Sequence, residues 1–181
     1  MKNMAMQPSV PELCGELAFG PRLLSDVLGC FPAGVAIVTA SGRNGARYGV
    51  TISSFNSVSL DPPLALFSLS RRLLSLNGSI LQAEAFAVNF LRDDQEHLSS
   101  RFSTALIDKW HRVEYRLGHT GSPILVPALA ILECRTYAQY DGGDHVIVVG
   151  RVTHLEADVG RPPLVLFRGR YHTVSRPEQT V

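Results

Sequence analysis

Apolar and β-branched residues recur along the chain in short runs that alternate with polar residues, which is the pattern of β-strands. The predicted strands cover residues 34–40, 47–55, 64–69, 85–91, 128–140, 145–155 and 164–167. The two longest runs flank the turn sequence DGGD at 141–144 and therefore predict an antiparallel hairpin. Strands dominate and no regular alternation of strand and helix appears, so a closed or split antiparallel barrel is the expected architecture.

Three other segments have the spacing of short helices, namely 21–31, 72–83 and 93–102. The first is expected to begin at Pro21, since proline fits the first turn of a helix. Residues 56–60 are predicted to be a polar connection between strands. Residues 103–122 are polar, charged and irregular, and we expect a mobile loop there.

Length and composition indicate one folded unit. The chain has 181 residues, of which 45% are hydrophobic and 18% are charged, so it can form one sizeable core. We expect flexible tails at 1–18 and 177–181 around a single domain at 19–176. The formal net charge of +1 offers no broad basic surface for phosphates, so nucleic acid is not an expected partner.

Cysteine usage and the terminal sequence point to the cytoplasm. Cys14, Cys30 and Cys134 are far apart and form no CxxC pair, which fits a reducing compartment. The first 17 residues have no apolar segment of the signal-peptide kind, and no stretch is long and apolar enough for a membrane span. We therefore expect no membrane association.

Several common catalytic and binding motifs are missing. The sequence contains neither GxGxxG after a strand nor GxxxxGK[ST], so any nucleotide must be held by another kind of site. It lacks the GxSxG elbow of acyl-transfer enzymes and the HExxH motif. The six histidines, at 97, 111, 119, 145, 154 and 172, show no ligand-like spacing, so no metal site is expected.

Hydroxyl side chains gather at and after the second predicted strand. They are Thr51, Ser53, Ser54, Ser57, Ser59, Ser68, Ser70 and Ser75. Hydroxyls and free backbone N–H groups can hold a phosphate or the edge of a flavin ring. Taken alone, however, such a cluster is more typical of an ordinary polar strand end and loop, because serine is a common loop residue.

A series of motifs gives the cluster a more specific meaning. They are YGVTISSFNSVSLDPPLALFSLS (48–70), FPAGVAIVT (31–39), FAVNFL (86–91), LSSRF (98–102), GDHVIVVGRV (143–152) and PLVLFRGRYH (163–172). Together, and in this order along the chain, they resemble the short-chain NAD(P)H:flavin oxidoreductases, the flavin reductase components of two-component monooxygenases. The resemblance covers nearly everything from residue 21 to 174.

The resemblance implies a mainly β fold, a split antiparallel barrel of the Greek-key, FMN-binding type with short flanking helices, assembled as a homodimer. It implies hydride transfer from NADH to FAD, with NADPH and FMN as the alternatives, and delivery of reduced flavin to a partner oxygenase. Because the hydride passes from one cofactor to the other, no catalytic base is expected from the chain. The alternatives are a non-catalytic split-barrel protein that binds flavin or haem, and a dimeric structural protein with a vestigial pocket.

The resemblance also assigns residues to each cofactor. The expected contacts to the flavin ring and ribityl chain are Thr51, Ile52, Ser53, Ser54, Phe55, Ser57 and Val58. The expected phosphate-binding segment is Leu73, Leu74 and Ser75. The expected contacts to the nicotinamide nucleotide are His145, Arg170, Tyr171 and His172.

Several of these roles have competing interpretations. Relatives often have hydroxyl or basic residues where this chain has two leucines, so phosphate binding falls to Ser75, with Arg71 or Arg72 as further candidates. Without its motif, a histidine beside a Gly-Gly turn is more often a plain surface residue. Tyr171 is almost equally compatible with an aromatic plug of the barrel. Trp110 is compatible with a lid or with a dimer contact.

Overall fold

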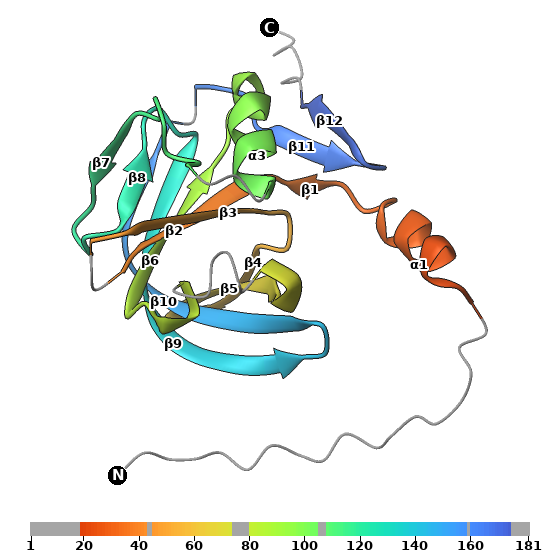
Figure 1. Cartoon of the computed structure of the whole chain (residues 1–181), viewed down its shortest axis with the longest axis horizontal. Helices are drawn as coiled ribbons and strands as arrows, with labels where there is room; N and C mark the ends of the chain where they lie inside the picture. The colour runs from red at the N-terminus through yellow and green to blue at the C-terminus, as the bar shows by residue number, and fades with distance from the viewer. Residues whose placement is uncertain (1–18, 43–44, 74–79, 105–107, 159, 175–181) are drawn as a thin grey trace, which may run out of the picture.

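The frame of the protein is a seven-stranded antiparallel sheet. The computed structural model describes residues 19–42, 45–73, 80–104, 108–158 and 160–174 (Figure 1). The strands of the large sheet are β2 (Ala36–Ser41), β3 (Arg47–Ile52), β4 (Asn56–Leu60), β5 (Pro63–Ser70), β6 (Ala85–Phe90), β9 (Ala130–Gly142) and β10 (His145–Ala157). Their order across the sheet is β3-β2-β6-β9-β10-β5-β4. The mainly β, antiparallel architecture predicted from the sequence is therefore confirmed.

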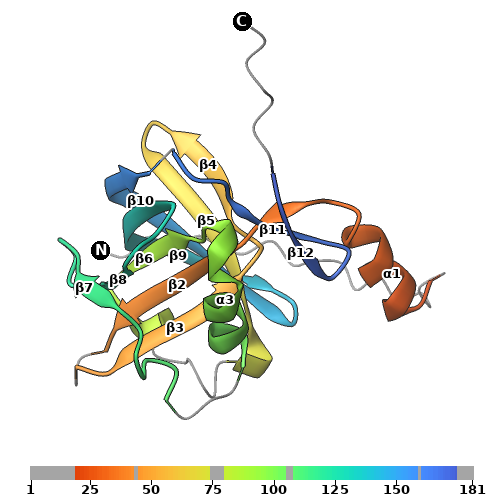
Figure 2. The same cartoon turned by 90° about the horizontal axis from the view of Figure 1, so that it is seen from above.

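The sheet curves strongly but does not close into a complete barrel. Its two edge strands, β3 and β4, are joined by the short connection 53–55 (Figures 1 and 2). The end of β3 therefore lies near the start of β4. Among the described residues no β-ladder pairs β3 with β4. The outer edge of β3 instead receives side-chain hydrogen bonds, because Trp110 and Lys109 donate to the carbonyls of Arg47 and Gly49.

Two small sheets and short helices surround this frame. The small sheets are β1 (Ala33–Gly34) with β11 (Leu164–Phe167) and β12 (Arg170–Thr173), and β7 (Tyr115–Leu117) with β8 (Pro123–Leu125). The helices that lie wholly within the described residues are α1 (Pro21–Leu28), η1 (Arg71–Leu73), η2 (Asp93–Gln95) and α3 (Glu96–Ser103). No helix in the described part of the chain has the length and apolar character needed to cross a membrane.

Apolar side chains pack on both faces of the sheet. One cluster includes the Phe67 and Phe86 rings, whose centroids are 5.3 Å apart in an edge-to-face arrangement. The other lies beneath α3 and includes Ile37, Phe102 and Leu125. Because β2 contributes to both clusters, five of its six residues, Ala36 to Ala40, are buried, which explains its nearly continuous apolar sequence.

The structure corrects several predicted element boundaries. Residues 56–60 are not a polar connection, because they pair with β5 as the edge strand β4. Residues 170–173 likewise pair with β11 as β12, although the sequence pattern did not predict a strand there. The predicted helix 72–83 can be followed only in part, since residues 74–79 lie outside the described residues, as do the predicted tails at 1–18 and 177–181.

The segment predicted as a mobile loop, 103–122, instead contains packed structure. Trp110 packs edge-to-face against Phe102, with ring centroids 5.1 Å apart, and its indole N–H donates to the carbonyl of Arg47 at 3.1 Å. Lys109 is buried beside it and donates to the carbonyls of Phe102 and Gly49. Burial lowers the pKa of Lys109. Contacts of Trp110 and Lys109 with other elements thus hold part of a segment whose sequence is mostly polar.

A buried carboxylate holds the turn between β7 and β8. Glu133 is 2% exposed and accepts hydrogen bonds from the backbone N–H of His119 and from both the N–H and hydroxyl of Thr120, at 2.7–3.1 Å. Burial alone would raise the pKa of Glu133, but these hydrogen bonds and the His119 ring lower it from 4.5 to about 2. The ionised carboxylate therefore stabilises the folded state.

We predict that Glu133→Gln reduces the acid sensitivity of the fold. Because the folded-state pKa is depressed, the ionised carboxylate stabilises the protein above about pH 4.5, and this contribution is lost as the pH falls towards about 2. The contribution of the ionised carboxylate to the free energy of unfolding amounts to about 3 kcal/mol. Urea unfolding should show a lower free energy of unfolding for the variant at pH 7. Below pH 4.5 this free energy should decline less steeply for the variant than for the wild type. Parallel pH profiles for the two proteins would contradict the assignment.

Candidate functional site

The residues predicted to bind flavin lie where the sheet is left open. The end of β3, the connection 53–55 and the start of β4 together form what we call the seam, residues 51–58. Edge strands present unpaired backbone donors and acceptors, and the seam adds short hydroxyl side chains to them. Such a surface can match the alternating donors and acceptors along the edge of a planar heterocycle.

Hydrogen bonds tie one side of the seam to α3 and β12. The hydroxyl of Thr51 donates to the carbonyl of Ser99 at 2.7 Å, and the Ser99 hydroxyl lies 2.8 Å from the hydroxyl of Tyr171. Ser99 is fully buried, while Thr51 and Tyr171 are half-buried. The chain Thr51–Ser99–Tyr171 therefore joins a predicted flavin residue to a predicted nicotinamide residue.

The other residues of the seam divide into packed and open positions. The side chain of Ile52 is buried in the core, and Phe55 packs edge-to-face on Phe90 at 4.8 Å, so these two can meet a ligand mainly through their backbone. The hydroxyl of Ser54 donates to the carbonyl of Ser68 and accepts from its N–H. The remaining members are exposed, and they are Ser53, Asn56, Ser57 and Val58.

Pairing of β5 with β10 brings the GDH turn next to the predicted phosphate segment. His145 lies directly opposite Ser70 in this ladder. Arg71 then donates from its guanidinium to the carbonyl of Gly143 at 2.9 Å and to a carboxylate oxygen of Asp141 at 2.8 Å, and its backbone N–H donates to the carbonyl of Asp144. The Arg71 hydrogen bond lowers the pKa of Asp141. The guanidinium and the backbone N–H of Arg71 are therefore both hydrogen-bonded to the turn.

His145 is oriented by its own neighbour. Its Nδ1 lies 2.6 Å from a carboxylate oxygen of Asp144, and the same hydrogen bond lowers the pKa of Asp144. A carboxylate at Nδ1 favours the proton on that nitrogen, which leaves Nε2 for another partner. The His145 side chain is 41% exposed, so a ligand can reach it.

The predicted nicotinamide residues do not all lie in one part of the fold. Tyr171 borders the seam through Ser99, whereas Arg170 and His172 are exposed on β12. Figure 1 draws β12 at the top of the molecule and the turn between β9 and β10 at the lower right. Leu73 ends η1, and Leu74 and Ser75 lie outside the described residues.

Sequence reasoning did not predict the residues that connect these groups. Ser99 stands inside the LSSRF run, but no signal in the sequence pairs it with a tyrosine 72 positions later. Arg71 was a candidate for phosphate binding, and its contact with Asp141 spans 70 positions. Two surface pockets flank Pro127, and none of the predicted flavin or nicotinamide residues lines them.

Comparison with known proteins identifies the family of the chain. A family model described as "Flavin reductase like domain" matches residues 28–175. A probable flavin reductase of Rhizobium meliloti is 41% identical over 86% of this chain and 49% of its own length. The reductase subunit of a flavin-dependent monooxygenase from Rhodococcus jostii is 36% identical over 91% of this chain and 83% of its own.

A solved structure shows the same likeness in three dimensions. The NADH:FAD oxidoreductase of Streptomyces globisporus, in complex with NAD and FAD fragments, is 33% identical and has a TM-score of 0.81. The match covers 91% of this chain and 99% of that protein. In contrast, this chain spans only about half the length of the Rhizobium relative.

We predict that Tyr171→Phe and Ser99→Ala each lower the free energy of unfolding by about 1 kcal/mol, because each removes one partner of a mostly buried hydrogen bond. The double variant should cost less than the sum of the two, since both changes break the same interaction. Tyr137→Phe serves as the control, because Tyr137 is exposed. Strictly additive losses in urea unfolding would show that the two hydroxyls do not interact.

Proposed function

Because the chain belongs to the flavin reductase-like family, we propose that it is an NAD(P)H-dependent flavin reductase that passes a hydride from NADH to FAD. FMN and NADPH are the alternative substrates. The observation that carries the proposal is the seam itself, an open pair of strand edges lined with hydroxyls. A turn that presents an accessible histidine lies at the end of β5 that leads into the predicted phosphate segment.

The seam suits the polar parts of a flavin. Backbone groups of residues 53–58 at the seam are suited to the heteroatom edge of the isoalloxazine ring, and Ser53 and Ser57 are suited to the ribityl hydroxyls. The phosphate falls to the segment after β5, at residues 73–75. Arg71 is already bonded to the turn, so the exposed Arg72 is the better candidate for a phosphate contact.

The nicotinamide nucleotide is assigned to His145 and to β12. Nε2 of His145 is available to a ligand because Asp144 occupies Nδ1. Tyr171 can provide a ring face beside the seam, and Arg170 and His172 are exposed where a phosphate or ribose could meet them. The two nucleotides thus approach the seam from different elements.

Hydride chemistry is supplied by the bound cofactors, and the chain's residues have to bind, orient and shield them. Reacting atoms must be held about 3–3.5 Å apart, which requires rigid supports. Arg71 fixes the turn that carries His145, and Ser99 fixes Thr51 relative to Tyr171. These contacts are the structural basis for alignment.

Delivery of reduced flavin to a partner oxygenase completes the proposal. The Rhodococcus jostii relative is named as the reductase subunit of a flavin-dependent monooxygenase, and this chain covers most of it. A seam at the open edge of a sheet also suits a flavin that must leave after reduction, because such a site is shallow.

A homodimer is part of the same proposal. Apolar residues of α1 and its end project from the body of the protein and are exposed, namely Leu23, Leu24, Val27, Leu28 and Phe31. None of the residues of α1 is buried within the chain, and Phe31 is 79% exposed. An apolar stripe of this kind is typical of a protein interface. A second copy of the chain is the occupant we propose.

The proposal predicts that the purified protein oxidises NADH when FAD or FMN is added, and not when flavin is absent. Loss of NADH absorbance measures the reaction, and a protein-free mixture gives the background rate. A non-catalytic flavin- or haem-binding protein would bind its ligand without this reaction. Failure to oxidise NADH or NADPH with either flavin would overturn the enzyme assignment.

Two variants separate the cofactor sites. His145→Ala should raise the KM for NADH by about tenfold and leave flavin affinity unchanged, because it removes one hydrogen-bonding group. Ser57→Leu should weaken flavin binding, measured by fluorescence titration, by at least about tenfold, since it adds bulk and removes a hydroxyl. Each variant is the control for the other. Weaker flavin binding in His145→Ala, together with a raised KM for NADH in Ser57→Leu, would show that the two sites are wrongly assigned.

The dimer is tested by charging the apolar stripe. Val27→Asp should convert the dimer to a monomer in sedimentation at micromolar concentration, because it places a carboxylate in an apolar interface. Ser25→Asp adds the same charge on the same helix beside the stripe and should leave the dimer intact. A monomeric wild-type protein would contradict the proposal.

A further inference from the structure

We propose that His119, Glu133 and His154 form a binding site for a divalent transition-metal ion, with Zn²⁺ as the representative case. Each residue offers one ligand atom, and these atoms all lie within 4.8 Å of one another. The proposal does not depend on the flavin chemistry, because none of these residues belongs to the seam or to the GDH turn.

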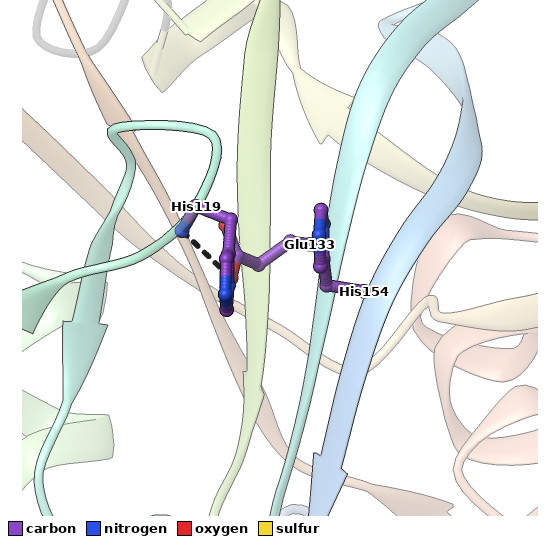
Figure 3. A group of neighbouring side chains, drawn as sticks. All are labelled: His119, Glu133 and His154. Atoms are coloured by element: carbon purple, nitrogen blue, oxygen red, sulfur yellow. Dashed lines mark hydrogen bonds and ion pairs between the residues drawn. The ribbon is translucent and has the colours of Figure 1, made fainter.

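The three residues come from three separate parts of the fold. His119 lies in the turn between β7 and β8, Glu133 in β9 and His154 in β10 (Figure 3). Irregular pairing of β9 with β10 places His154 opposite Glu133. Their spacing along the sequence matches no metal motif, so the cluster became visible only in the folded chain.

The geometry of one pair already resembles that of two ligands on one ion. Nδ1 of His119 lies 3.2 Å from Oε1 of Glu133. Two ligands at about 2.0–2.2 Å from a tetrahedral zinc ion are separated by about 3.4 Å. An ion can therefore take the place of the proton that this nitrogen and oxygen share.

His154 is placed to complete the set. Its ring stacks on the ring of His119, with centroids 4.1 Å apart and planes only 2° from parallel. In parallel rings the nitrogen lone pairs do not converge on one point, so one ring must rotate to share an ion. Both histidines are exposed, and the His119 side chain is 63% exposed, so this rotation meets little resistance.

The surroundings of the carboxylate also favour a cation. The Glu133 side chain is buried, and the hydrogen bonds to its carboxylate among the described residues come from His119 and Thr120 alone. No lysine or arginine in that part of the chain forms an ion pair with it. Buried charges in proteins are commonly balanced by a counter-charge or a metal ion.

The chemistry of the ligands selects the class of metal. Two imidazoles and one carboxylate suit Zn²⁺, Co²⁺, Ni²⁺ or Cu²⁺, whereas Mg²⁺ and Ca²⁺ prefer sites made of oxygen alone. Solvent can supply the remaining ligand, because both rings are at the surface. A bound ion would link the β7–β8 turn to the β9–β10 hairpin and stabilise the folded state by mass action.

The site is also remote from the predicted nicotinamide site. His145 and His154 are nine positions apart on the same strand, which corresponds to about 30 Å at the rise of a β-strand. Metal binding can therefore be measured without any flavin readout.

The test uses untagged, EDTA-treated full-length protein titrated with Co²⁺, whose visible absorbance reports nitrogen-rich coordination. We expect saturable binding of one ion per chain, displacement by Zn²⁺, and a higher unfolding temperature with Zn²⁺. His119→Asn and His154→Asn should each weaken binding by at least about tenfold. His97→Asn replaces an exposed histidine outside the cluster and should bind as the wild type does.

The two histidine variants carry the test, because replacing Glu133 would also remove the hydrogen bonds that hold the turn. Absence of saturable Co²⁺ binding in the wild type would overturn the proposal. Binding that survives in either histidine variant would also overturn it, because the ion would then be held elsewhere or by one ring alone.

Discussion

The arrangement of the candidate site depends on the pairing of β10 with two strands at once. β10 forms one ladder with β9 and another with β5, and so joins the two halves of the seven-stranded sheet. Its first residue, His145, is thereby fixed opposite Ser70, where β5 leads into the predicted phosphate segment. The same ladder keeps β5 and β4 on the side of the sheet that faces β3 across the seam. Without it, neither the seam nor the turn would have a defined position.

Parts of this fold follow directly from sequence. The β9–β10 hairpin was predictable because two long alternating runs flank a glycine-rich turn. β4 was not, because most of its side chains are exposed and its polar residues hide the alternation. The segment around Trp110 was also missed, since its order comes from contacts with Phe102 and Arg47, which lie in other elements. Such tertiary contacts override a local pattern.

The candidate site was likewise predictable only in part. Motifs predicted the residues of the seam and the turn, but they did not indicate which of these residues contact one another. Ser99 connects Thr51 with Tyr171 across long stretches of chain, and Arg71 joins the end of β5 to the turn. The histidine cluster at the other end of β10 is a further case, because strand register pairs Glu133 with His154 and hydrogen bonds from the β7–β8 turn add His119. Sequence spacing carries no information about register between distant strands.

The central claim is that this chain aligns a nicotinamide and a flavin so that a hydride passes directly between them. Anaerobic rapid mixing of the protein and FAD with NADH, unlabelled or deuterated at C4, tests this most directly. The account predicts that the flavin is bleached far faster than in a protein-free mixture and that deuterium slows the reaction. Bleaching no faster than in the protein-free mixture would contradict the account.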